Sequence, residues 1–115
     1  MKIKTSELTG AALDWAVAKC GGGGNFPASF KTAHQYGRSN YSTDWAQGGP
    51  IIEREGMGVW MYEWNEEGEP EVGWYTEDKD GNHVRTGPTP LIAAMRCYVA
   101  SKLGDTIDVP EELTC

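Results

Sequence analysis

The chain has 115 residues, which is enough for one domain that buries about two thirds of its unfolded surface. Its hydrophobic fraction of 39% and charged fraction of 23% are ordinary for a globular protein, but five tryptophans and fifteen glycines are unusual. The net charge of −7 argues against a nucleic-acid polymer as partner, because a protein that binds phosphate backbones needs a basic face.

The three cysteines, Cys20, Cys97 and Cys115, lack the spacing of a metal site. Their odd number, without a signal peptide ahead of them, indicates reduced thiols in a cytoplasm. No apolar run approaches the length of a membrane span. We therefore expect a cytoplasmic protein without a membrane partner, a bound metal or a cofactor.

The first half of the chain predicts a helix and then an irregular segment. Residues 1–5 alternate Ile3 with lysines and indicate a short edge strand or a lead-in, and residues 9–20 have helical apolar spacing. Four glycines end that helix at residue 21, because they cost much conformational entropy and pack nothing. Residues 21–40 are expected to form an irregular Gly-rich loop, either functional or mobile.

Residues 42–56 begin with three capping residues and contain Gly48, Gly49 and Pro50. This pattern predicts two short helical turns broken at the two glycines, or one helix bent there.

An antiparallel meander should follow. Residues 59–64 alternate aromatic and other side chains, residues 72–76 return after an acidic turn, and residues 83–86 form a third short strand. Asp80-Gly81 is the strongest hairpin signal in the chain.

The last predicted element is a helix over residues 89–103. Thr89 can cap its first turn, Pro90 suits the first helical position, and Gly104 can end it in the left-handed conformation. Four residues recur at helical spacing and should be buried against the meander: Leu91, Met95, Val99 and Leu103.

The expected fold is therefore a single α+β domain over residues 1–115. A small antiparallel sheet of three to four strands would be covered by helices, in an arrangement like an α-β-α sandwich.

The best candidate binding segment is residues 42–52. Trp45 can stack on a planar ring, Gln47 can donate and accept hydrogen bonds, and Gly48 and Gly49 let a ligand approach the backbone. A helix start at Pro50 would add free amides to the same space. The alternative, that Trp45 and Ile51 are core residues and the glycines only bend the chain, is equally open.

The entry to the last helix is a second candidate. Thr86 and Thr89 are neutral donors there, and Arg85 and Arg96 would supply positive charge if they faced the same pocket. Each arginine alone is more often a surface residue.

The sequence contains no recognisable catalytic constellation. His34 and His83 are far apart, and neither lies in a Ser/His/Asp or Cys/His pattern. Only His83, with Asp78 or Asp80 nearby, could act as a base. We expect a protein that is not an enzyme.

Three blocks of the sequence resemble a known family. Residues 1–18 (MKIKTSELTGAALDWAVA) resemble the opening of the NinX family of lambdoid phages, and residues 42–56 and 87–103 resemble its two other signature blocks. The Gly-rich segment after Cys20 departs from the pattern, and the meander lies outside it. The resemblance implies a phage protein of the host cytoplasm, similar to small phage helix–sheet–helix sandwich domains, with no established activity.

Two functional hypotheses follow. The first is a sponge that binds and sequesters a small nucleotide-derived immune signal without turnover, as some accessory phage proteins do against host defence. The alternative is an inhibitor of a host defence or DNA-metabolism protein that docks through an acidic surface with exposed aromatics, such as Trp60, Tyr62 and Trp64. Because three short strands leave open edges, a two-fold homo-oligomer is also expected.

Overall fold

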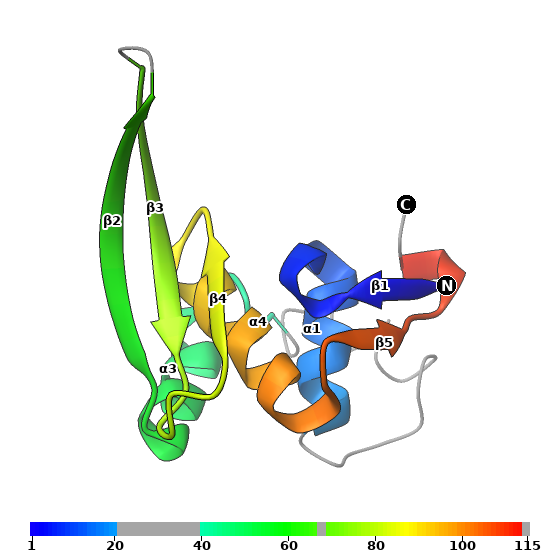
Figure 1. The fold of residues 1–115 in the computed structure, drawn as a ribbon. Helices are drawn as coiled ribbons and strands as arrows, with labels where there is room; N and C mark the ends of the chain where they lie inside the picture. The colour runs from blue at the N-terminus through cyan, green and yellow to red at the C-terminus, as the bar shows by residue number, and fades with distance from the viewer. Residues whose placement is uncertain (21–39, 67–68, 114–115) are drawn as a thin grey trace.

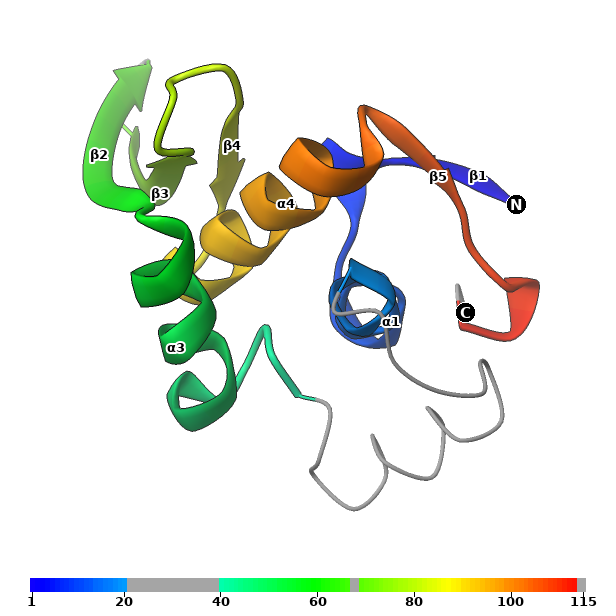
Figure 2. The same ribbon diagram turned by 90° about the horizontal axis from the view of Figure 1, so that it is seen from below.

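The fold is built around one helix, α4 (Pro90–Leu103), which lies between a sheet and the other helices (Figure 1). This computed structural model describes residues 1–20, 40–66 and 69–113. On one side of α4 lies a three-stranded antiparallel sheet of β2 (Gly58–Glu66), β3 (Glu69–Glu77) and β4 (Val84–Gly87). Helix α1 (Gly10–Cys20) packs on the other side, and α3 (Trp45–Glu55) lies against its flank (Figure 2). The α+β prediction is confirmed.

Helix α4 begins and ends where the sequence predicts. The Thr89 hydroxyl accepts a hydrogen bond from the amide of Ile92 at 3.1 Å, Pro90 occupies the first turn, and Gly104 caps the end with φ of 92°. Leu91, Met95 and Val99 are buried, as predicted, but in a cluster whose buried members come from α1, α3, α4 and the two ends of the chain rather than from the meander. The prediction for Leu103 is wrong: it is exposed, because the chain from residue 102 to 106 lies at the surface.

The core extends from α4 to α1. Helix α1 begins one residue later than predicted and buries Leu13, Trp15 and Val17 against α4 and its neighbours. α4 is buried on most of its sides, because its small residues let neighbouring elements approach closely. Its buried small residues are Ala93, Ala94, Cys97 and Ala100.

The predicted meander is present, with longer strands than the sequence suggested. β2 pairs with β3 without interruption from Gly58↔Glu77 to Glu66↔Glu69. β4 pairs only with the second half of β3, from Trp74↔Gly87 to Glu77↔Val84. The β2–β3 hairpin therefore extends past the rest of the molecule (Figure 1). The Asp80-Gly81 signal lies in a loop between β3 and β4, in which the Gly81 amide donates to the Asp78 carbonyl at 3.0 Å.

The expected edge strand at the start of the chain is β1 (Lys2–Lys4), but its partner was not predicted. β1 pairs antiparallel with β5 (Thr106–Asp108), which places Ile3 opposite Ile107. These two strands form a small separate sheet rather than a fourth strand of the meander. The predicted loop at 21–40 lies outside the described residues, except for Asn40.

Of the two alternatives predicted for residues 42–56, a single helix, α3, is present, and a break at the two glycines is not. α3 is one continuous α-helix through Gly48, Gly49 and Pro50. Asp44 caps it by accepting a hydrogen bond from the Ala46 amide at 2.9 Å, so the helix begins well before Pro50. Gly56, with φ of 65°, ends it.

Candidate functional site

The candidate residues on α3 take up different roles. Trp45 is 55% exposed, so it is not a core residue and its ring is open to solvent. Gln47 holds the start of the helix: its Oε1 accepts from the Asn40 amide at 2.7 Å and its Nε2 donates to Asp44 at 3.0 Å. The idea of free amides beside Pro50 is wrong, since Pro50 lies inside the helix and the free first turn is capped by Asp44.

Gly48 serves the packing of α3 against α4. A Cβ atom at this position would collide with the carbonyl oxygen of Tyr41 and with the side chain of Leu91. The space beside Gly48 is thus filled by protein atoms. A Cβ at Gly49 would only meet the Trp45 ring at 3.7 Å, an ordinary contact.

The candidate residues of β4, α4 and the connection between them form a second group, bonded mostly to the backbone. Arg96 donates from Nε to the Leu8 carbonyl at 2.6 Å and from a terminal nitrogen to the Thr86 carbonyl at 2.8 Å. Arg85 pairs with Asp105 at 2.8 Å. Thr89 is the cap of α4.

Part of this second group faces an open pocket. Arg85 and Thr86 line a surface pocket of about 480 Å³ with Lys4, Asp105 and Thr106. Gly48 of α3 does not line this pocket; it lies beside Leu91, in the first turn of α4. The lining of this pocket includes none of the four candidate residues of α3. Whether either group binds a ligand stays a prediction.

The bonds of Arg96 lead to a stability prediction. Arg96→Met leaves the Leu8 carbonyl without its charged donor, so we expect the free energy of unfolding to fall by about 1.5–3 kcal/mol. Arg54→Met is the matched control, since 60% of the Arg54 side chain is exposed, and it should change stability by less than about 0.5 kcal/mol. Urea denaturation measures both. If Arg96→Met lowers the free energy of unfolding no more than Arg54→Met does, the hydrogen bonds of Arg96 do not stabilise the fold.

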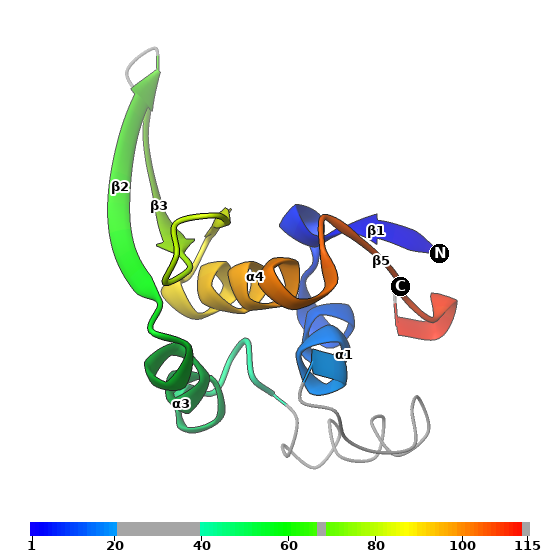
Figure 3. The same ribbon diagram turned by 60° about the horizontal axis from the view of Figure 1, so that its bottom comes forward.

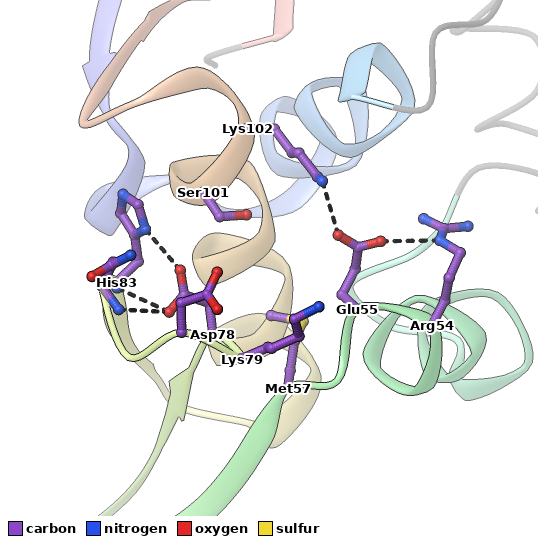
Figure 4. Close-up of a pocket in the computed structure, with 10 residues that line it drawn as sticks. Arg54, Glu55, Met57, Asp78, Lys79, His83, Ser101 and Lys102 are labelled. Carbon is purple, nitrogen blue, oxygen red and sulfur yellow. Dashed lines mark hydrogen bonds and ion pairs between the residues drawn. The ribbon is translucent and has the colours of Figure 1, made fainter.

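A polar pocket of about 360 Å³ lies where α3, the β3–β4 loop and the end of α4 meet (Figure 4). Glu55 bridges two cations on its wall: it accepts from Lys102 at 3.0 Å and from Arg54 at 3.2 Å. The hydrogen bond from Lys102 lowers the pKa of Glu55, and the same bond raises the pKa of Lys102. Positive and negative groups alternate here, so the pocket lacks the excess positive charge that a phosphate ligand favours.

His83 and Asp78 meet in this pocket, as the enzyme reading would require. The Nδ1 atom of His83 lies 2.9 Å from Asp78 Oδ2, but Asp78 also accepts from the backbone amides of Asn82 and His83 at 2.8 and 3.2 Å. These bonds close the β3–β4 loop. The hydroxyl of nearby Ser101 donates to the Tyr98 carbonyl at 2.7 Å.

The loop bonds predict a pH dependence. The hydrogen bond from the His83 ring lowers the pKa of Asp78, so its stabilising effect is complete above the unfolded value of about 4 and disappears as pH falls through the folded value. Asp78→Asn should therefore destabilise the protein most at pH 7, and the difference from wild type should close in acid. Urea melts across this range test it, with exposed Asp80→Asn as control. A difference that stays constant with pH would contradict this role.

An aromatic cluster lies on the face of the sheet turned away from α4. The ring of Trp60 stacks on Tyr75 with centroids 5.3 Å apart, and Tyr62 lies 6.4 Å from the same ring. We call Trp60, Tyr62 and Tyr75 the aromatic face. Trp60 is 44% exposed, and no described helix covers this side of β2 and β3 (Figures 1 and 3).

Two glycines make this cluster possible. A Cβ at Gly58 would collide with the Trp60 ring, and one at Gly73 with the Tyr62 ring. The rings thus lie flat across the strands. The prediction named Trp60, Tyr62 and Trp64; it missed Tyr75, although pairing the two strands across residues 67–68 puts position 75 opposite Trp60. The side chain of Trp64 lies outside the described part.

The strands that carry the aromatic face are acidic. β2 and β3 contain no lysine or arginine, and their five glutamates are Glu63, Glu66, Glu69, Glu71 and Glu77. Met61 on β2 is 55% exposed and adds apolar surface beside Glu63. Large exposed aromatics next to charge are typical of protein-binding surfaces.

Comparison with known proteins gives the family. The family model described as "Bacteriophage P22, NinX" matches residues 4–102, and no curated protein matches the chain. Within the described helices, no segment has the length and apolar character to cross a membrane. Among the residues that the structure describes, no three histidine, cysteine or acidic side chains gather as metal ligands would. Since the matched residues cover most of its length, the chain belongs to the NinX family of bacteriophage proteins.

Proposed function

We propose that this phage protein docks onto a basic surface of a host protein through its aromatic face, and so inhibits a defence or DNA-metabolism protein. The observation that carries the proposal is the ring cluster of Trp60, Tyr62 and Tyr75, laid over glycines on an uncovered side of an acidic sheet. Rigid aromatic rings bury much area at low entropy cost and dominate binding energy in protein interfaces.

Charge supports the same choice of partner. The net charge of −7 and the five glutamates of β2 and β3 attract a basic surface and repel an acidic one. Such steering acts mainly on the association rate and weakens as salt screens it. The protein acts by occupying its partner, and the proposal requires no turnover, metal or cofactor.

The test compares two exposed tryptophans. Protein immobilised through its C-terminus should retain a stoichiometric basic protein from host lysate, and high salt should release it. Trp60→Ala should weaken this binding by about 2 kcal/mol, because it removes a central aromatic anchor. Trp45→Ala removes a ring on α3 that is even more exposed, at 55%, and should leave binding unchanged. If both substitutions have the same effect, or neither has one, the aromatic face is not the docking surface.

A second candidate function is sequestration of a small nucleotide-derived ligand, and one observation favours it. The open ring of Trp45 could stack on a base, a contact worth about 1–3 kcal/mol. A bound ligand would raise the melting temperature of wild type more than that of Trp45→Ala. Denaturing the loaded protein should return the ligand chemically unchanged, and recovery of a cleaved product would instead indicate an enzyme.

A further inference from the structure

The two outer strands of the three-stranded sheet are protected to very different degrees. β4 has four residues, and its Arg85 carries an inward charge that is 17% exposed and paired with Asp105. Short edges with inward charges resist the addition of another strand. β2 has nine residues, and its pairing with β3 runs from one end to the other without a bulge.

β2 also lacks the residues that usually block an edge. Its sequence, GVWMYEWNE, contains neither lysine nor proline. In the described part of the chain β2 pairs on one side only, and the views of Figures 1 and 3 show it as the outermost strand. Its outer row of backbone amides and carbonyls can therefore accept a further strand.

Charge selects what that strand is. A second copy of this chain would bring its own glutamates against those of β2 and β3, and like charges across strands are destabilising. A basic segment would instead meet Glu63, which is exposed next to Met61. We propose that the edge of β2 binds an extended basic segment of another protein, which adds to the sheet as a fourth strand.

The side chains of β2 specify the pattern of this segment. Because strand residues alternate between faces, an added strand would lie beside Trp60 and Tyr62 on one face and beside Met61 and Glu63 on the other. A β-branched apolar residue such as valine suits the first face, since it packs well against these rings, and lysine or arginine pairs with Glu63 on the second. The ligand class is an extended peptide with alternating basic and apolar residues. This inference rests on the proposed function, because it describes how the partner engages the aromatic face.

The experiment uses a synthetic peptide of alternating lysine and valine as probe. Hydrogen exchange of the intact protein, followed by amide NMR, should show new protection of outward-facing β2 amides when the peptide binds. A matched peptide with proline in place of each valine keeps the charge but lacks half of the amides, so it should bind about tenfold more weakly. Equal binding of the two peptides, without protection of β2, overturns the inference.

Two single substitutions separate the edges. Met61→Lys places a positive charge on the β2 edge and should weaken binding of the lysine–valine peptide about tenfold, because like charges repel. Val84→Lys adds the same charge at the other edge, at a residue that is 48% exposed, and should change binding less than twofold. Unchanged melting temperatures verify that both variants fold. If light scattering shows a dimer and its outward-facing β2 amides are protected without peptide, a second copy occupies this edge and the basic segment is excluded.

The outcomes also separate this inference from the proposed function. If Trp60→Ala releases the host partner but β2 amides gain no protection in that complex, docking occurs on the face without strand addition. If Trp60→Ala has no effect on the host partner, the proposed function fails whatever the peptide does.

Discussion

Replacing Met95 by alanine is expected to lower the free energy of unfolding by about 2–5 kcal/mol. Met95 is fully buried in the middle of α4, within the cluster that joins α4 to α1. Truncation removes apolar contacts on several sides and leaves a cavity, because the surrounding helices and sheet can relax only in part. Urea denaturation, monitored by tryptophan fluorescence and by circular dichroism, measures the change.

The chain offers a control of the same residue type. Met61 on β2 is 55% exposed, so Met61→Ala should change stability by less than about 0.5 kcal/mol. A loss for Met95→Ala within that range would mean that α4 is rotated about its axis relative to this structure.

The second large effect is expected at Gly48. Gly48→Ala should destabilise the protein by about 1–3 kcal/mol, since its new methyl group would overlap the Tyr41 carbonyl and the Leu91 side chain. The backbone of Tyr41 cannot yield as a flexible side chain would. α3 and α4 would have to separate.

The neighbouring glycine is the matched control. Gly49→Ala adds the same methyl group one position along, where the Trp45 ring is 3.7 Å away, and should stabilise α3 by up to about 1 kcal/mol. Thermal melts of the two variants should thus shift in opposite directions. If Gly48→Ala is as stable as Gly49→Ala, the close approach of α3 to α4 is wrong. A ligand role for Gly48 would then be open again.

The parts of the fold that depend on local chemistry were predictable. Thr89 and Pro90 set the start of α4 within one turn of the chain, and Gly104 sets its end, so no tertiary information was needed. The meander was predicted because alternating aromatics identify strands and the turns between them are short. The same locality explains the accurate limits of α1.

The features that the sequence did not settle are those that depend on contacts between segments far apart in the chain. β5 is three residues long, and its pairing with β1 joins residues about a hundred positions apart, which no local pattern shows. In α3, glycines and proline disfavour a helix by intrinsic propensity, but the Asp44 cap and packing on α4 outweigh that preference.

The candidate site shows the same division. Residue types alone made Gly48 and Arg96 reasonable ligand contacts, whereas Gly48 packs against Leu91 and Arg96 bonds to Leu8 across the chain. The aromatics Trp60, Tyr62 and Trp64 were named as an alternative because they lie within one strand. The stacking partner of Trp60, Tyr75, comes from the next strand and depends on register.

Hydrogen exchange of the protein bound to its captured host partner is the most direct test of docking through the aromatic face. Such docking predicts slower exchange in β2 and β3 around Trp60 and Tyr75, with α3 unchanged, and a complex that dissociates as salt is raised. Slower exchange confined to α3 around Trp45, with β2 and β3 unchanged, would contradict docking through the aromatic face and place the binding surface on α3.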